Sequence, residues 1–309
     1  MNQNRNLYEG KVFDAHSHFS VETSAIAEDA DEIGFTVHNK TIEEHVDFMD
    51  RVGISRSIIS DPTVKYMDDR DKCKEYCRIV NETGSKAVKE YPERFQFAAS
   101  LPLPYTEDAL EELRYAVEQL DACAVLLSTN YGGVYLGDPV VEPVLEKAAE
   151  YGLPVLLHPT APKDYPKKPI TGQVLPMFEF IADTTRTVLD MLASGVLVRN
   201  PNLKIVVPHS GACLPVALDR FKEVMKLQER EVTIPLDCFY FDLACNAFPR
   251  GISILMKLTD TDHILYGTDY PPVPESTLQK EIVQARNCTE PGVDLQKILW
   301  ENAEELFGC

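Results

Sequence analysis

The sequence predicts an α/β protein whose whole chain forms one (β/α)8 barrel, the TIM-barrel fold. Eight short apolar segments alternate with amphipathic segments along the 309 residues. No low-complexity stretch or Pro/Ser-rich linker divides the chain. Strands that alternate with helices pair in parallel, and eight such strands close most simply into a barrel. We therefore expect a single domain that spans residues 1–309.

The competing fold is an open, doubly wound sheet. That fold usually binds a nucleotide at a glycine-rich turn after its first strand. In this chain the first predicted strand ends in the sequence HSHFS, which contains no glycine. The closed barrel is therefore the preferred prediction.

The predicted strands are short and rich in Val, Ile, Leu and Phe, as buried parallel strands are. They comprise residues 11–19, 55–61, 95–102, 122–129, 153–159, 203–211, 239–244 and 263–271. Active sites of such barrels lie at the carboxyl ends of the strands. The residues that end each strand are therefore the first candidates for function.

Helical periodicity fills the segments between the strands. After Thr106, a predicted N-cap, apolar residues share one face of a helix. Further helices are predicted for residues 139–151, residues 178–195 and the segment DLQKILWENAEELFG. Residues 20–54 resemble an insertion after the first strand that ends in a helix, TIEEHVDFMDRVG. A barrel would place this insertion over the mouth of the active site, as a lid or a wall.

Composition excludes several classes of partner. The chain has 49 acidic and 30 basic residues, a net charge of -19, which leaves little for the basic face that binds nucleic acid or an anionic membrane. No run of 18 apolar residues is present to span a membrane. The N-terminal sequence lacks the apolar core of a signal peptide, and the eight cysteines form no CxxC pair. These features predict a cytoplasmic protein with reduced thiols.

Histidines and one aspartate gather at the carboxyl ends of the predicted strands. His16 and His18 end the first strand, where residues two apart point the same way. His158 ends the fifth strand, His209 the sixth and Asp269 the eighth. Imidazoles together with a carboxylate suit Zn²⁺ or a similar divalent ion with one open position. The other three histidines end no strand and are interpreted as lid or surface residues: His38, His45 and His263.

Four motifs in these strands resemble the amidohydrolase superfamily. They are DAHSHF, LLHP, VPHSG and YGTDYP, in that order along the chain. The segments between them, such as LLSTNYGGVYLGDP and ENAEELF, are similar to one branch of the superfamily. That branch includes aminocarboxymuconate-semialdehyde, γ-resorcylate and 6-methylsalicylate decarboxylases. The resemblance covers nearly the whole chain.

The resemblance implies a role for each matching residue. His209 would be the catalytic histidine beside a metal-bound water, and Asp269 would act in catalysis as well as in metal binding. Arg220 matches an arginine that binds the substrate carboxylate, in some members across a dimer interface; an ion pair on a helix surface is the alternative. Arg186, in the sequence DTTR, is interpreted as structural. The implied metal ligands are His16, His18, His158 and Asp269.

One absence narrows the expected chemistry. Binuclear hydrolases of the superfamily carry a carboxylated lysine or a glutamate at the end of strand four, where this chain has AVLLSTN. This difference favours one divalent ion, Zn²⁺ first and Mn²⁺ as the alternative. We therefore expect a non-oxidative decarboxylase of a small aromatic or muconate-type carboxylic acid, similar to 6-methylsalicylate or a hydroxybenzoate. The resemblance also implies a homodimer or a higher homo-oligomer.

Two other functions stay open at this point. A metal-dependent hydrolase or hydratase of a lactone, an amide or a related small molecule would use the same ion to activate water. A metal-binding scaffold without activity would keep the ligands alone, since a fold does not fix a function. Within decarboxylation, Asp269 would deliver a proton with help from His209, or His209 would deprotonate a metal-bound water. The sequence does not choose between these two routes.

Overall fold

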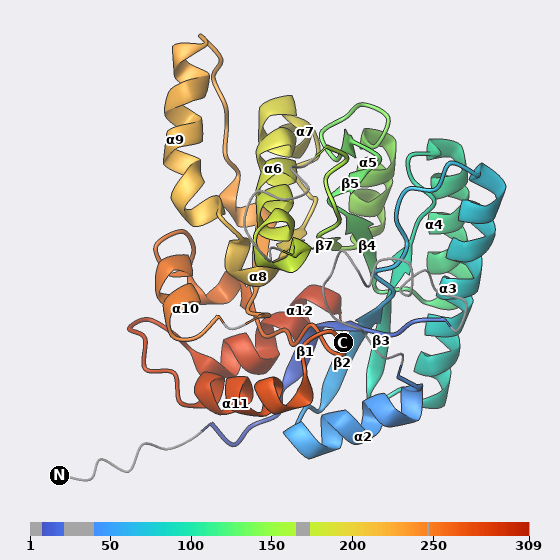
Figure 1. Cartoon of the computed structure of the whole chain (residues 1–309), viewed down its shortest axis with the longest axis vertical. Helices are drawn as coiled ribbons and strands as arrows, with labels where there is room; N and C mark the ends of the chain where they lie inside the picture. The colour runs from blue at the N-terminus through green and yellow to red at the C-terminus, as the bar shows by residue number, and fades with distance from the viewer. Residues whose placement is uncertain (1–7, 22–39, 165–173, 246, 309) are drawn as a thin grey trace.

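Eight strands form one parallel sheet in the order β1-β2-β3-β4-β7-β8-β9-β10, with helices on its outside (Figure 1). This computed structural model describes residues 8–21, 40–164, 174–245 and 247–308. The strands are β1 Phe13–His18, β2 Arg56–Ser60, β3 Phe95–Ser100, β4 Ala124–Ser128, β7 Val155–His158, β8 Ile205–Val207, β9 Phe239–Asp242 and β10 Ile264–Leu265.

Backbone hydrogen bonds between the first strand and the segment around the last strand close the barrel. The amide of Ala15 donates to the carbonyl of Tyr266 over 2.9 Å, and the amide of His18 donates to the carbonyl of Tyr270 over 2.7 Å. Ser17 and Tyr270 also form a parallel bridge. The predicted (β/α)8 barrel is therefore confirmed, while its description as a single domain over residues 1–309 remains a prediction.

Helices follow most strands and pack around the sheet. They are α2 Ile42–Val52, α3 Arg70–Glu90, α4 Thr106–Leu120, α5 Glu142–Tyr151, α6 Glu179–Ser194, α7 Val196–Arg199, α9 Leu214–Leu227, α10 Arg250–Leu255, α11 Glu275–Arg286 and α12 Asn302–Phe307. A short hairpin, β5 Asn130–Tyr131 and β6 Val134–Tyr135, follows β4. Two short turns also matter for the site: η2 Leu175–Met177 and α8 Pro208–Gly211.

Helix α2 shows how local sequence sets an element's limits. The amide of Glu44 donates to the Thr41 hydroxyl, and the Glu44 carboxylate accepts from the amide of Thr41, which forms a capping box. Gly53 ends the helix with a left-handed φ of 80°. The predicted helix within residues 20–54 is therefore the regular barrel helix between β1 and β2. The lid predicted for the rest of this segment falls mainly on residues 22–39, which lie outside the described residues.

Helix α4 begins one residue away from its predicted cap. Its N-cap is Tyr105, and Thr106 is its first helical residue. The Thr106 hydroxyl donates to the carbonyl of Val140 over 2.7 Å, so it does not cap the helix. The prediction of Thr106 as the N-cap was therefore wrong, because a tertiary contact uses its side chain.

Strand β1 changes the face that it presents to the barrel interior. Phe13 and Ala15 belong to an apolar cluster that also contains buried side chains of β2, β3, β4, β7, β8, β10 and α12, and Phe13 contacts the rings of Trp300 and Phe307. Strict alternation would then point His16 and the next even residue away from the interior. The register of β1 with β2 shifts between Asp14 and Ser17. Such an irregularity allows odd-numbered residues before the shift and even-numbered residues after it to face the barrel interior.

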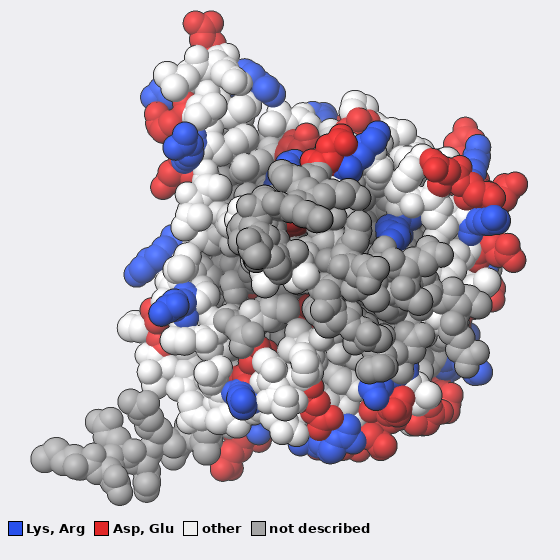
Figure 2. Space-filling view, in the orientation of Figure 1, with Lys and Arg blue, Asp and Glu red and all other residues white. Residues whose placement is uncertain are grey.

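On the face shown in Figure 2, Lys and Arg side chains are scattered among Asp and Glu and form no single basic patch. No described helix combines the length and apolarity needed to cross a bilayer.

Candidate active site

Four side chains meet at the carboxyl ends of the strands, as the sequence predicted. His16 and His18 come from β1, His158 ends β7, and Asp269 lies four residues after β10. One ligand atom from each lies within 4.8 Å of the others. The Nε2 atoms of His16 and His18 are 3.1 Å apart, and Asp269 Oδ1 lies 3.6 Å from the first and 3.1 Å from the second. The structure therefore brings the four predicted ligands into one buried cluster.

Hydrogen bonds on the far side of both β1 histidines fix their tautomers. His16 Nδ1 lies 2.8 Å from Asp242 Oδ2, which only accepts when ionised, so this nitrogen carries the proton. His18 Nδ1 lies 3.1 Å from the Ser60 hydroxyl, and that hydroxyl donates to the carbonyl of Ser17. His18 Nδ1 must therefore donate as well. Both Nε2 atoms are left with lone pairs that point into the cluster.

When both rings are neutral the two Nε2 lone pairs face each other, and a cation between them, either a proton or a metal ion, removes their repulsion. Atoms bound to one ion at about 2.0–2.3 Å lie roughly 3.0–3.7 Å apart at octahedral to tetrahedral angles. The separations of 3.1, 3.1 and 3.6 Å among His16, His18 and Asp269 fall in this range. His158 Nδ1 is buried and has no hydrogen-bond partner among the described residues, so it also has a free lone pair or proton. The donor set fits one divalent ion such as Zn²⁺ or Mn²⁺.

The charges in the cluster agree with this assignment. Burial disfavours the charged form of His16, but the Asp242 carboxylate outweighs burial and raises the pKa of His16 to about 9. A proton there occupies the place that a metal ion would take. Burial and the two β1 histidines hold the pKa of His158 well below its usual value. Burial opposes ionisation of Asp269, yet contacts with His18 and His209 hold its pKa well below the usual range.

A buried aspartate positions the turn that carries Asp269. Asp14 accepts from the amide of Thr268 over 3.0 Å and from its hydroxyl over 2.6 Å. The amide of Asp269 donates to the carbonyl of His16 over 2.7 Å, and Asp269 adopts a left-handed φ of 55°. A Cβ at Gly267 would lie 2.8 Å from His16 Cβ, so only glycine fits this approach. The sequence YGTDYP thus encodes the position of one candidate metal ligand relative to β1.

His209 lies beside the cluster, although not on the predicted strand. Strand β8 ends at Val207, and Pro208 begins the short turn α8, in which His209 has a φ of 58° and a ψ of 52°. The prediction of a strand through residue 211 was therefore wrong, because proline lacks the N–H that would continue the ladder. His209 Nε2 lies 3.6 Å from Asp269 Oδ2 and is buried without a hydrogen-bond partner in the described chain.

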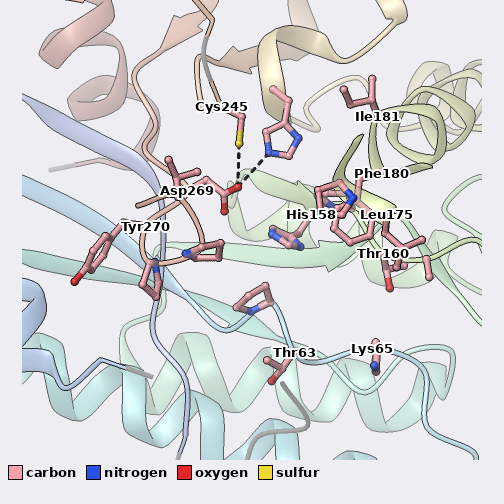
Figure 3. A pocket seen from close by; sticks show the side chains of 18 of the residues that line it. Thr63, Lys65, His158, Thr160, Leu175, Phe180, Ile181, Cys245, Asp269 and Tyr270 are labelled. Atoms are coloured by element: carbon pink, nitrogen blue, oxygen red, sulfur yellow. Dashed lines mark hydrogen bonds and ion pairs between the residues drawn. The ribbon is translucent and has the colours of Figure 1, made fainter. Parts of the chain in front are cut away.

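Two residues of the site were missed in the sequence. Asp242 ends β9 and serves both sides of the site: Oδ2 contacts His16, while Oδ1 accepts from the amide of His209 over 3.0 Å. Its place close to the carboxyl end of the predicted strand FYFDLA was a visible signal. Cys245 follows three residues later with a φ of 62°, and its Sγ lies 3.2 Å from Asp269 Oδ2 (Figure 3). No sequence signal identified this thiol.

Two members of the cluster, His158 and Asp269, line a cavity of about 1230 Å³, together with His209 and Cys245. In Figure 3, apolar side chains lie on one side of His158, and Asp269 and Cys245 lie on the other. The apolar wall comes from η2 and α6 and comprises Leu175, Pro176, Phe180 and Ile181. The polar lining includes Thr63, Lys65, Asn130, Thr160 and Lys163. The cavity can therefore place a flat apolar ring beside the cluster and a charged group near a lysine.

The remaining residues singled out in the sequence lie in different places. Arg220 is exposed on α9 and does not line the cavity of its own chain. Arg186 contacts Asp183 over 2.5 Å and the Tyr135 hydroxyl over 3.2 Å, so it joins α6 to the β5–β6 hairpin as expected. His263 pairs with Asp260 near the surface.

His45 corrects one interpretation, because it is neither a lid nor a surface residue. It is 1% exposed and packs among the rings of Phe48, Phe95 and Tyr270. Burial, with smaller contributions from His18 and Arg94, lowers its pKa to about 3. His38 lies outside the described residues.

Comparisons with known proteins agree with this geometry. The model of the family described as Amidohydrolase matches residues 13–309. The 6-methylsalicylic acid decarboxylase of Penicillium expansum is 29% identical over 280 residues, which cover 86% of each chain. Decarboxylase macB of Penicillium terrestre is 31% identical over 247 residues, 74% of this chain and 73% of that protein. The crystal structure of an amidohydrolase II has a TM-score of 0.86 at 29% identity and covers 97% of this chain and 100% of its own.

Proposed function

The chain belongs to the amidohydrolase family, and on that premise we propose that it is a metal-dependent, non-oxidative decarboxylase of a small aromatic or muconate-type carboxylic acid. The preferred substrates are of the 6-methylsalicylate or hydroxybenzoate kind. The observation that carries this proposal is the 3.1 Å approach of the His16 and His18 Nε2 atoms, in a cluster whose other members, His158 and Asp269, line a cavity with an apolar wall. The decarboxylase names of the similar proteins support the same reaction.

His16, His18, His158 and Asp269 are the proposed ligands of one divalent ion. Zn²⁺ is our first choice; Mn²⁺ is the alternative, and a structure of the dihydroxybenzoic acid decarboxylase from Polaromonas contains manganese. When bound, such an ion supplies positive charge that holds the substrate carboxylate and an adjacent oxygen in place. Asp242 and Ser60 support this role because they orient the two β1 imidazoles.

The reaction replaces a carbon–carbon bond with a carbon–hydrogen bond. The ring carbon takes up one proton, and the bond to the carboxyl group breaks to release CO2. If the bond broke before the ring carbon was protonated, that carbon would be left as an unstabilised carbanion. The proton must therefore arrive before or with bond cleavage. His209 Nε2 and Asp269 Oδ2, 3.6 Å apart and beside the cavity, are the proposed pair that handles this proton.

The cavity walls support an aromatic substrate. Phe180, Ile181 and Leu175 form an apolar surface against which a ring packs. Lys65 and Lys163 offer local positive charge to a substrate carboxylate, in a lining that also contains Glu44, Asp47 and Glu275. Of the three lysines in residues 159–177, only Lys163 lies in the described part of the chain.

We further propose that the enzyme works as a homodimer or a higher homo-oligomer. Helix α9 stands away from the barrel in Figure 1, and Val216, Arg220, Val224 and Leu227 are exposed at helical spacing along it. This stripe would fit against a second copy and would bring Arg220 towards the partner's cavity. Equal mixing of Arg220→Ala and His209→Ala subunits tests this idea. Partial recovery of activity would support it, whereas a wild-type monomer in sedimentation would refute it.

The seven described cysteines form no disulfide, which supports a reducing, cytoplasmic location.

The activity itself is tested by supplying Zn²⁺ or Mn²⁺ to the purified protein and measuring CO2 release from a panel of hydroxybenzoates. We expect CO2 from at least one of them and none after chelation of the metal. Turnover of lactones or amides without CO2 from any acid would instead identify a hydrolase.

A further inference from the structure

The carboxylate of Asp269 faces two groups of ligands at once. Oδ1 points towards the β1 histidines, 3.1 Å from His18 Nε2. Oδ2 points the other way, 3.2 Å from Cys245 Sγ and 3.6 Å from His209 Nε2. Figure 3 shows the contact between Cys245 and Asp269 at the edge of the cavity. One oxygen therefore belongs to the proposed metal centre, and the other belongs to a second cluster.

We propose that His209, Cys245 and Asp269 form a second cation site, selective for thiophilic divalent ions such as Zn²⁺ and Cd²⁺ and bridged to the first site by the Asp269 carboxylate. Ligand atoms from all three residues lie within 4.8 Å of one another. Bonds of about 2.0–2.3 Å to one tetrahedral ion place ligand atoms roughly 3.3–3.7 Å apart. The distances of 3.2 and 3.6 Å from Oδ2 are close to these values.

The protein holds the second cluster ready for an ion. His209 Nε2 is buried and has no hydrogen-bond partner among the described residues. Cys245 is exposed to the cavity, so an ion can reach the cluster from solvent. Asp242 Oδ1 accepts from the amides of both His209 and Ala244, each over 3.0 Å, which ties together the two loops that carry the ligands. Three protein ligands leave a fourth position open to water.

The two sites should differ in metal selectivity because only the second site contains a sulfur ligand. The first cluster offers only nitrogen and oxygen, which suit Mn²⁺ and Zn²⁺ alike. The second includes a thiol, and a bond from sulfur to the ion forms as the thiol loses its proton to solvent. Thiolates favour Zn²⁺ and Cd²⁺ over Mn²⁺. Each chain should therefore bind one Mn²⁺ ion but two Zn²⁺ or Cd²⁺ ions.

An ion in the second site would inhibit turnover. This consequence rests on the proposed function, because the ion would use His209 Nε2 and Asp269 Oδ2, the pair that handles the proton. Excess Zn²⁺ should then inhibit the enzyme, while excess Mn²⁺ should not. Binding of the second ion does not depend on which reaction the enzyme catalyses.

The binding test uses the full-length protein, freed of metal and titrated with Cd²⁺ or Mn²⁺. Bound metal is measured by atomic emission, and sulfur–cadmium bonds are measured by their ultraviolet charge-transfer absorption. We expect two Cd²⁺ and one Mn²⁺ per chain, with the absorption appearing with one of the two Cd²⁺ ions. Cys245→Ser should bind one Cd²⁺ without the absorption. Cys288→Ser, which removes a half-buried thiol outside the site, should behave as the wild type.

A single Cd²⁺ per wild-type chain, or a charge-transfer band that survives in Cys245→Ser, would overturn the proposal. Because the positive φ of Cys245 strains every L-residue, Cys245→Gly provides a second variant should the serine variant fold poorly. Its retained Mn²⁺ site would report an intact barrel. Inhibition by excess Zn²⁺ is measured separately as CO2 release. Absence of CO2 with every metal would contradict the proposed decarboxylase activity. The second cation site would then still be tested by the number of Cd²⁺ ions bound per chain.

Discussion

The two halves of the site are built on different kinds of backbone. His16, His18 and His158 lie on strands whose hydrogen bonds and register hold them in the barrel wall. His209, Cys245 and Asp269 all lie beyond strand ends and adopt φ values of 58°, 62° and 55°. Such left-handed conformations cost about 1–3 kcal/mol each in residues other than glycine. The half that is proposed to handle protons is thus strained, whereas the three histidines of the proposed metal-binding half have no left-handed φ.

This contrast indicates a division of labour between the two halves. A regular strand fixes a ligand with little strain, and metal binding needs fixed ligands. Strained turns cluster at functional sites, where the surrounding structure must hold them in place. Asp269 belongs to both halves, since its two oxygens face different clusters. The following substitutions test whether the halves can be separated.

The largest effect is expected from removing a strand-borne ligand. His158→Ala should reduce bound Mn²⁺ to near zero per chain and lower kcat/KM by far more than the roughly 10–100-fold loss typical of outer residues around a metal. Metal content by atomic emission and CO2 release measure the two quantities. A variant that keeps its full metal content would show that His158 is not a ligand and would remove the distinction between the halves.

A change in the strained half should separate activity from metal binding. His209→Ala should keep one Mn²⁺ per chain, because the first cluster does not include this residue. Loss of a proton-handling group lowers kcat by about 10²–10⁴-fold. Metal analysis and single-turnover CO2 release check this outcome. Near-normal turnover in this variant would show that the proton comes from elsewhere.

Asp242 connects the halves, so its variant should damage both to a moderate extent. Asp242→Asn replaces the ionised carboxylate that accepts from His16 Nδ1 with a neutral amide. We expect metal affinity to fall about 10–100-fold. Ser60→Ala is the matched comparison, because it removes the corresponding acceptor of His18 but has no contact with the His209 turn. Mn²⁺ titration should give a smaller loss for the serine variant; an equal loss would mean that Asp242 acts through β1 alone.

The smallest effect concerns strain itself. Ala212, in the turn after His209, has a φ of 54° and a ψ of -123°, a region that only glycine adopts easily. Ala212→Gly should raise the free energy of unfolding by about 1 kcal/mol, since relief of about 1–3 kcal/mol exceeds the added unfolded-state freedom of glycine. Ala149→Gly, within helix α5, should lower it by about 1 kcal/mol. Urea denaturation measures both; a destabilised Ala212→Gly would show that the turn carries no strain.

The same contrast explains what the sequence could predict. Strand-borne ligands follow from apolar runs that end in histidine, and those predictions placed His16, His18 and His158 correctly at strand ends. The contact of Asp242 with His16 joins residues 226 apart in the chain and depends on β1 and β9 facing each other across the barrel. No local pattern encodes such a contact.

Two errors had signals in the sequence that were given too little weight. Pro208, in the sequence VPHSG, indicated that the sixth strand ends before His209. His45 shares helical spacing with Phe48, Met49 and Val52, which marks it as part of the buried face of α2. The left-handed turns had no such signal, because φ at His209, Cys245 and Asp269 is set by tertiary contacts rather than by residue type.

Closure of the barrel between β1 and the segment after β10 also sets the time at which the metal centre can exist during synthesis. His18 and Asp269 are 251 residues apart in the chain. At about 5–20 residues per second, a ribosome needs roughly 13–50 s to make the residues between them. Until then the β1 histidines have no Asp269 beside them and no final strand to hold their backbone. The nascent chain must therefore extend past Asp269 before the four proposed ligands can come together, so the proposed metal centre forms only after the last strand has been made.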